Sequence, residues 1–323
     1  MRLSVLESTA APQGQLAYDA LQQSIVVARA AEFAGYHRIW VTEHHAEPTI
    51  ASSAPAVLIA ALAARTATIR VGAGGVMLVN HPPLVVAEQF ATLEALHPGR
   101  IDLGVGAAAG VSSTSAAVRE ALGSADRVPA AHPARLDELI GFVRADLPAD
   151  HPFRTVEVAP RVRPVPVFVL GSSVRGAELA AARGLPFAFA HHLGATRPEP
   201  VLARYRSKFR GIGSSPQAYA IISVAVLCAE SDRAAERLAG QVIAGYGNRR
   251  RGTDPGGVGS LIVGGPQTVA DRLSALAETT GADEVMVAPI ERDGPGRVRT
   301  LRQIADGFIG YAAAARSRPA GVA

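Results

Sequence analysis

Two pairs of adjacent histidines could carry acid–base chemistry. His44 and His45 come directly after one apolar segment, and His191 and His192 come directly after another. Imidazole is the side chain whose ordinary pKa lies nearest neutral pH, so either pair could supply a general base or a hydrogen-bond donor. Because side chains alternate along a strand, only one member of each pair can face a given side. A rim histidine held by a neighbouring carboxylate is the competing interpretation, and we favour it for the second pair.

A metal hydrolase is an alternative use of these histidines. Barrel hydrolases usually carry two histidines separated by one residue after the first strand, and Leu6-Glu7-Ser8-Thr9 offers no such pair. The sequence also has no Cys/His cluster with zinc spacing. We therefore expect no metal.

Two glycine-rich segments could approach a ligand closely. Gly74 and Gly75 interrupt an apolar strand-like segment, where glycines mark a bulge or make room for a flat ring system. Tight packing inside a barrel is the alternative. The segment Gly104–Gly110 resembles a dinucleotide fingerprint, but its spacing is one residue too long and no acid follows that could hold a ribose. A nicotinamide-binding fold is therefore disfavoured.

An anion site is predicted where Ser172, Ser173, Arg175 and Gly176 follow the strand-like segment Val165–Leu170. Two hydroxyls, an arginine and the N-terminus of the next helix would together favour a phosphate. Helix capping by serine is the alternative. The place of these residues at the C-terminal end of a strand favours phosphate.

The elements that position these residues alternate between strand and helix. The predicted strands are apolar on both faces, which indicates a parallel sheet covered by helices. They are Leu3–Leu6, Arg38–Val41, Ile69–Leu78, Ile101–Val105, Pro166–Leu170, Pro186–Ala190, Ala220–Cys228 and Glu284–Ala288. The predicted helices between them include Ala17–Ala34, Leu84–Leu96, Asp137–Ala145, Gly176–Arg183, Asp232–Ala244 and Val269–Thr279. Eight such units with a final helix from about Arg297 to Ala315 predict an α/β fold, a (β/α)8 TIM barrel. A doubly wound sheet is the alternative.

Two segments, Gly106–Arg127 and Tyr246–Ser260, fit neither element type, and we expect them to be rim insertions. Neither has a sharp boundary, so we expect one domain over residues 1–323.

Composition narrows the class further. The chain has 323 residues, 48% hydrophobic and 19% charged, which excludes a disordered or disulfide-based protein. The lone cysteine, Cys228, fits a reducing compartment. The net charge of +4 comes from arginines interleaved with acids, so we expect no nucleic-acid partner. The longest apolar run, Ala54 to Ala64, is shorter than the roughly 20 residues that span a bilayer. We expect a soluble, cytoplasmic protein without a membrane partner.

Taken together, these segments resemble the bacterial luciferase-like monooxygenase family over nearly the whole chain. The branch it resembles most is often found with actinobacterial natural-product pathways. The matching pieces are Gly35–His45, Val71–Leu78, Asn80–Gln89, His97–Gly104, Gly171–Gly176, Phe187–Leu193 and Val263–Val287.

The resemblance implies a homodimeric barrel that binds reduced flavin mononucleotide (FMN) at its C-terminal rim. A separate flavin reductase, a transient partner, would supply the reduced FMN, and O2 would be the cosubstrate. We expect hydroxylation or epoxidation of a small hydrophobic molecule, such as a polyketide natural-product intermediate. One alternative is an oxidoreductase that uses the deazaflavin coenzyme F420. Another is a flavin-poor, non-catalytic homologue.

The resemblance also assigns residues. His44 matches the catalytic histidine beside the flavin ring. Gly74 and Gly75 match the bulge beneath the isoalloxazine, where the family often has a non-prolyl cis peptide. Ser172 and Ser173, with the amide of Gly176, match the phosphate-binding loop.

One position departs from the family pattern. The family commonly has an arginine just after the fourth strand to hold the flavin phosphate, and this chain has Ala107 there. We hypothesise that Arg175 replaces this arginine from the opposite loop.

Overall fold

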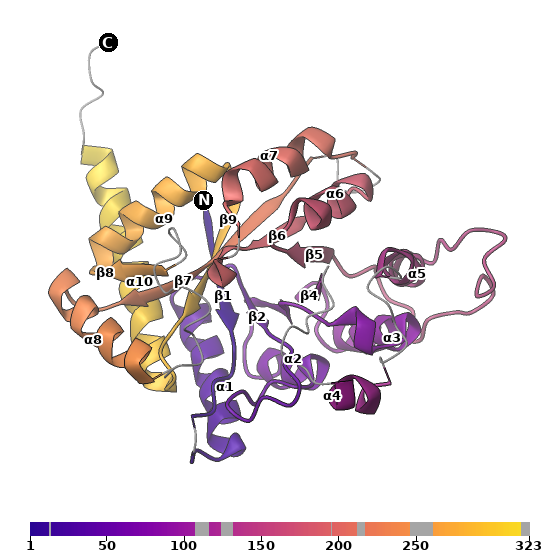
Figure 1. The fold of residues 1–323 in the computed structure, drawn as a ribbon, viewed down its shortest axis with the longest axis horizontal. Helices are drawn as coiled ribbons and strands as arrows, with labels where there is room; N and C mark the ends of the chain where they lie inside the picture. Colours follow the sequence, from indigo (N-terminus) through magenta and orange to yellow (C-terminus); the bar gives the residue numbers. More distant parts are fainter. Residues whose placement is uncertain are drawn as a thin grey trace, which may run out of the picture.

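The fold is a closed parallel barrel, as predicted (Figure 1). The computed structural model describes residues 1–12, 14–106, 116–123, 132–194, 196–211, 217–245 and 261–317, with side chains to residue 308 in the last segment. Within this part, β7 pairs with both β6 and β9, which closes a ring of eight strands, while β8 pairs with β7 alone. The strands are β1 Arg2–Glu7, β2 Arg38–Val41, β3 Arg70–Ala73, β4 Ile101–Gly106, β5 Val167–Gly171, β6 Phe187–Ala190, β7 Ala220–Cys228, β8 Leu261–Gly264 and β9 Glu284–Pro289.

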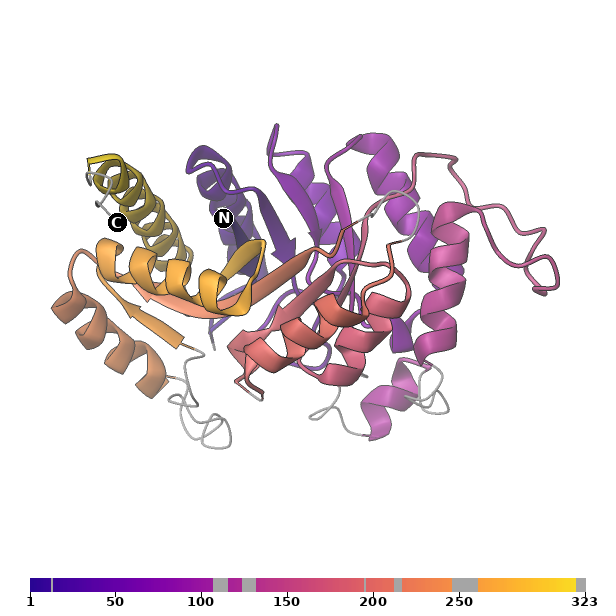
Figure 2. The same cartoon turned by 90° about the horizontal axis from the view of Figure 1, so that it is seen from above.

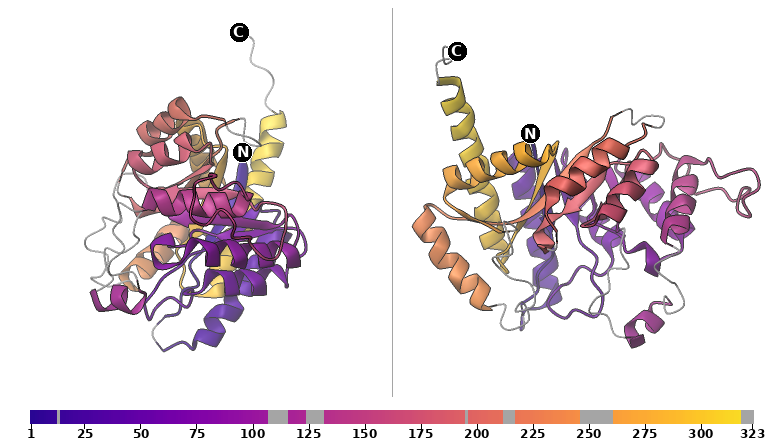
Figure 3. Two further views of the ribbon diagram at one scale, coloured as in Figure 1. Left: turned by 90° about the vertical axis from the view of Figure 1, so that its right-hand side faces the viewer. Right: turned by 45° about the horizontal axis from the view of Figure 1, so that its top comes forward.

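Helices cover the outer face of the ring (Figure 2). They are α1 Ala17–Phe33, α2 Pro55–Ala63, α3 Pro83–Leu96, α4 Ala116–Ala121, α5 His132–Arg144, α6 Val174–Ala182, α7 Pro198–Lys208, α8 Asp232–Gly245, α9 Pro266–Thr280 and α10 Gly294–Ser317, with short 3-10 turns at Leu78–Asn80 and His191–Leu193. Two further views place α8 on the side of the barrel away from α5 (Figure 3). Among the helices so described, none combines the length and apolarity needed to cross a bilayer.

The barrel interior is filled and is closed at its N-terminal end. Leu6, Trp40, Phe168, Ala188, Ile221 and Met286 form the inner apolar cluster. Below it, the Arg38 guanidinium pairs with Asp102 at 2.7 Å and with Glu284 at 2.9 Å. All three side chains are buried, so each charge needs its partner. Ligand access is therefore expected from the C-terminal end of the strands.

The predicted strand Ile69–Leu78 is too long. Regular pairing of β3 stops at Ala73 because the chain turns at Gly74 and Gly75, whose connecting peptide bond is cis. The Gly74 amide donates to the carbonyl of Val41 in β2, at 2.7 Å, and the Val76 amide donates to Gly104 in β4, at 2.7 Å. The chain thus changes partner strand across a bulge, as the glycines indicated.

Further differences concern the two expected rim insertions, the helix α7 and the strand β8. Of the two expected insertions, residues 107–115, 124–127 and 246–260 lie outside the described part of the chain, and 116–121 form α4. The helix α7 was not predicted because its sequence, PEPVLARYRSK, is largely polar. The strand β8 was not predicted because its four residues directly follow Tyr246–Ser260, a segment that fits neither element type.

The carboxyl group of Glu291 is buried, and this burial predicts how the stability of the protein depends on pH. Burial raises the pKa of Glu291 to about 7, and the hydroxyl of Thr300, which donates to its carboxylate, only partly opposes this. The unfolded chain ionises near the ordinary value of 4.5, so between pH 4.5 and 7 it releases a proton that the folded chain keeps. Stability should therefore fall as pH rises through this window, by up to about 3 kcal/mol.

Glu291→Gln should remove this pH dependence and be the more stable protein at pH 8. Urea unfolding of both proteins at pH 5 and pH 8 measures the difference. An unchanged slope of stability against pH in the variant would contradict the assignment to Glu291.

Candidate active site

His44 lies just beyond the C-terminal end of β2, which stops at Val41. Trp40, within β2, belongs to the inner cluster. The His44 amide donates to the carbonyl of Ser52 at 2.9 Å, which fixes the backbone, and the imidazole is half-buried. This burial lowers the pKa of His44, although the nearby charge of Glu47 opposes the effect. His44 is therefore neutral at pH 7 and able to accept a proton.

The carboxylate of Glu43 accepts from three donors. Its side chain is fully buried, and its Oε1 lies 2.7 Å from Nε2 of His45 and 2.8 Å from Nε2 of His81. Its Oε2 accepts from the amide of Met77 at 3.0 Å. Burial alone would raise the pKa of Glu43, but the hydrogen bonds from His81, Met77 and His45 hold it below its usual range. One carboxylate therefore joins the end of β2 to the segment after β3.

Within the described residues, one group has side chains placed as a metal ion would need. It consists of Glu43, His45 and His81, whose ligand atoms lie within 4.8 Å of one another. Two histidines and a carboxylate would suit a divalent transition metal. The separations of 2.7 and 2.8 Å are nevertheless those of hydrogen bonds, because two ligands of one such ion lie about 3 Å or more apart at metal–ligand distances near 2.1 Å. We interpret the group as a hydrogen-bonded cluster.

The predicted anion loop lies at the N-terminus of α6. Ser173 is the N-cap, and its Oγ accepts from the amide of Gly176 at 3.2 Å. The capping alternative is therefore present for Ser173. The amides of Val174 and Arg175 belong to the first turn and have no partner within the helix, and the half-buried Ser172 lies beside them. The loop has the donors that a phosphate needs, and its binding role stays a prediction.

Arg175 belongs to the first turn of α6, and its side chain is exposed. His132, at the start of α5, makes a hydrogen bond with the carbonyl of Gly106, the last residue of β4. Burial lowers the pKa of His132, and the charges of Arg183, Arg135 and Arg175 add to this effect. The replacement of the family arginine by Arg175 stays a prediction. Ala107 itself lies outside the described residues.

His191 and His192, the second histidine pair, contact neighbouring side chains. His191 is buried, and its ring lies 6.2 Å from that of Phe189. Nδ1 of His192 lies 2.7 Å from Oγ of Ser223, which in turn donates to the carbonyl of Phe189 at 3.2 Å. These contacts are with a ring and a hydroxyl, and the structural role favoured from the sequence stays a prediction.

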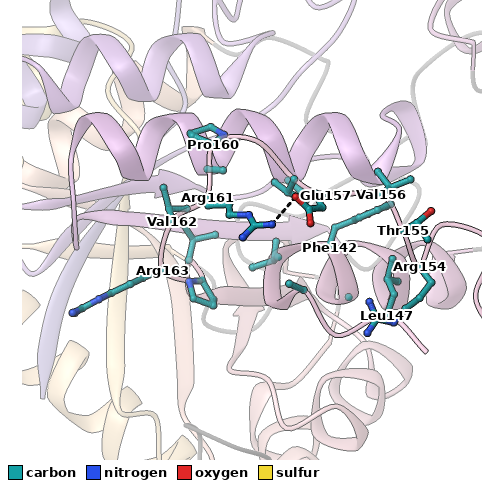
Figure 4. A pocket seen from close by; sticks show the side chains of 18 of the residues that line it. Phe142, Leu147, Arg154, Thr155, Val156, Glu157, Pro160, Arg161, Val162 and Arg163 are labelled. Atoms are coloured by element: carbon teal, nitrogen blue, oxygen red, sulfur yellow. Dashed lines mark hydrogen bonds and ion pairs between the residues drawn. The ribbon is translucent and has the colours of Figure 1, made fainter. Parts of the chain in front are cut away.

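A cavity of about 900 Å³ lies elsewhere on the molecule. It is bounded by α3, α5 and the segment 145–165, which projects from the body (Figures 1 and 4). Arg161 and Glu157 form an exposed 2.6 Å ion pair along this segment. None of the predicted site residues lines this cavity.

Four residues around the candidate site were not singled out from the sequence. Glu43 and His81 stand within the quoted segments, but their pairing joins positions 38 residues apart. Arg135 donates to the carbonyls of Leu78 and His81 from α5, and His132 holds Gly106. No signal within a single segment indicates these contacts, because each joins residues far apart in the sequence.

A closed parallel barrel with acid–base and anion-binding groups at the C-terminal ends of its strands is the arrangement of a (β/α)8-barrel enzyme. The profile of the family described as luciferase-like monooxygenase matches residues 1–284. A luciferase-like monooxygenase of Escherichia coli (strain K12) is 38% identical over 88% of this chain and 90% of its own length. The structure of apo-MsnO8 is 36% identical with a TM-score of 0.86, covering 95% of this chain and 98% of that one. The chain belongs to the luciferase-like monooxygenase family.

Other relatives differ in substrate and cofactor. An N-acetyl-S-alkylcysteine monooxygenase of Bacillus subtilis is 43% identical over 65% of this chain and 62% of its own length. Two solved structures share the fold alone. The oxygenating constituent of 3,6-diketocamphane monooxygenase from Pseudomonas putida, in complex with FMN, has a TM-score of 0.71 at 17% identity, covering 95% of this chain and 97% of that one. An F420-dependent secondary alcohol dehydrogenase has a TM-score of 0.67 at 15% identity, covering 95% and 98%.

Proposed function

We propose that this protein is a two-component flavin-dependent monooxygenase that uses reduced FMN and O2 to oxygenate a small hydrophobic substrate. The observation that carries the proposal is the common location of three groups at one end of the barrel. His44 follows β2, the Gly74–Gly75 turn follows β3, and the Ser172–Gly176 loop follows β5. A catalytic base, a ring-binding surface and a phosphate site would then share one mouth.

The residues present fit FMN in two respects. The α6 N-terminus supplies first-turn amides with an arginine beside them, which suits a phosphate. The Oγ1 of Thr42 and the Oδ1 of Asn80 are buried and have no hydrogen-bond partner among the described residues, so a polar ligand could satisfy them. The glycines carry less weight, because a Cβ on Gly75 would lie 2.8 Å from the carbonyl oxygen of Gly104 and thus meets protein atoms.

The protein's own contribution is binding, orientation and proton transfer. The amides of Val174 and Arg175 would hold the phosphate, and the turn at Gly74 and Gly75 would face the ring. When bound, reduced FMN supplies the electrons for activating O2. His44, neutral at pH 7, would accept a proton at an imidazole nitrogen. The apolar inner cluster below the mouth would keep water from the reacting atoms.

The test is anaerobic titration of the protein with reduced FMN, followed by O2 uptake with a flavin reductase and NADH. Saturable binding, with O2 uptake coupled to an oxygenated product when candidate hydrophobic substrates are present, would support the proposal. A protein that does not bind reduced FMN would contradict it.

Arg175→Ala tests the predicted phosphate contact. Removing a charge-assisted contact is expected to weaken reduced-FMN binding by one to two powers of ten, from a loss of about 1.5–3 kcal/mol. Reduced riboflavin lacks the phosphate, so its affinity should be unchanged. Arg161→Ala is the control, because Arg161 is an exposed arginine outside the site. Equal losses for the two flavins would show that Arg175 acts on fold and not on phosphate.

The second candidate function, an F420-dependent oxidoreductase, is favoured by the F420-dependent fold neighbour. It would transfer hydride without O2. Titration with F420 and turnover under nitrogen would identify it, and O2-dependent turnover would exclude it.

A further inference from the structure

The carboxylate of Glu43 is placed between two segments that both border the proposed flavin site. His45 belongs to the loop after β2, whereas Met77 and His81 follow the turn at Gly74 and Gly75. The carboxylate accepts from Nε2 of each imidazole and from the Met77 amide, using both of its oxygens.

The segment after the turn is held from two sides. On the outer side, the guanidinium of Arg135 donates to the carbonyls of Leu78 and His81. On the other side Glu43 holds the amide of Met77 and the ring of His81. A buried carboxylate is costly unless it is fully hydrogen-bonded, so these three donors must stay in place. Glu43 therefore couples the position of the turn to that of the end of β2.

We propose that Glu43 is a positioning residue: by binding His45, His81 and the Met77 amide, it fixes the Gly74–Gly75 turn against the end of β2 and so sets the relative placement of that turn and His44. The inference rests on the proposed function of the site. It also places a proton on Nε2 of both His45 and His81, because a carboxylate oxygen only accepts and each ring must therefore donate from that nitrogen.

Glu43→Gln is the sharpest variant, since glutamine has nearly the same shape but one acceptor oxygen in place of two. The glutamine amide cannot accept from the Met77 amide with one atom and from the two imidazoles with the other, because its nitrogen only donates. Glu94→Gln is the matched control. Glu94 is also a buried carboxylate that accepts a backbone amide, that of Gly99 at 2.7 Å, at the other end of the barrel.

Two readouts separate positioning from mere folding. In the ligand-free protein, ¹H–¹⁵N NMR of the imidazoles should show the Nε2–H form for His45 and His81, and Glu43→Gln should shift both sets of signals. In anaerobic titration, Glu43→Gln should weaken reduced-FMN binding at least tenfold, while Glu94→Gln keeps wild-type binding. Glu43→Asp, with both oxygens retained, should recover part of the loss.

Several results would overturn the proposal. Unchanged imidazole signals in Glu43→Gln would do so, as would equal binding losses in the two glutamine variants. One equivalent of Zn²⁺ bound by wild type and lost in His81→Ala would mark the cluster as a metal site instead. If wild type fails to bind reduced FMN while the NMR result holds, the proposed function fails and the bridge by Glu43 stands.

Discussion

Replacing His44 by alanine is expected to lower kcat for oxygenation by about 10²–10⁴-fold, the usual contribution of a positioned acid–base group. The fold should survive, because the His44 backbone contact to Ser52 does not involve the side chain. Wild-type activity should stay constant from pH 8 down past the ordinary histidine value of 6.5, since burial lowers the pKa of His44. The acid limb of the kcat profile should then lie below pH 6.5, and steady-state kinetics from pH 5 to 9 measure it.

His37→Ala is the matched control for His44→Ala. His37 precedes the same strand at the opposite end, and burial lowers its pKa too. A lowered histidine pKa also destabilises the folded state in acid, because below pH 6.5 the unfolded chain takes up a proton first. The profile should therefore be measured where both proteins keep their Tm. An acid limb that persists unchanged in His44→Ala would assign it to another group.

Gly104→Ala is expected to be the most destabilising single-methyl change near the site. A Cβ at this position would overlap the carbonyl oxygen of Ala73 in β3 and lie 2.9 Å from Cδ1 of Leu170 in β5. Both neighbours are fixed by the closed ring, so the strain cannot relax cheaply. We expect a loss of about 3 kcal/mol and a fall in Tm on the order of 10 °C, measured by calorimetry.

Gly240→Ala gives the opposite expectation at an exposed position in α8, where a new Cβ would have no atom within 4 Å. Alanine suits a helix interior better than glycine by about 0.5–1 kcal/mol, so Tm should hold or rise. Similar Tm values for Gly104→Ala and Gly240→Ala would mean that β3 and β4 can separate. Reduced-FMN binding should weaken in Gly104→Ala alone, because the Gly104 carbonyl accepts from Val76 just after the turn.

Much of the barrel could be predicted because parallel strands are buried on both faces. In β7 all nine residues are buried, so the sequence reads as one apolar run. The same rule predicted too long a strand at β3, because the apolar residues continue past Gly74 and Gly75 although regular pairing stops. The polar α7 is set by packing against α6, which an isolated segment cannot reveal.

The candidate site could be predicted only where it is local. Strand parity allowed only one of His44 and His45 to face the barrel mouth, and the family resemblance selected His44. The bonds of Glu43 to Met77 and His81 span 34 and 38 residues, and they depend on how β2 and β3 register in the ring. That register places Val41 opposite Ala73, which brings the two following segments together. No spacing within either segment contains this information.

The pairing of β8 indicates which part of the sequence can diverge without disturbing the eight-stranded ring. The eight-stranded ring closes without it, because β6 and β9 meet β7 directly. β8 adds only to the second half of β7, from Ala225 to Cys228. The α8–β8 unit is therefore an appendage by topology, and its length and sequence can diverge while the ring keeps its hydrogen bonds. Randomising residues there should therefore leave the hydrogen bonds of the eight-stranded ring in place.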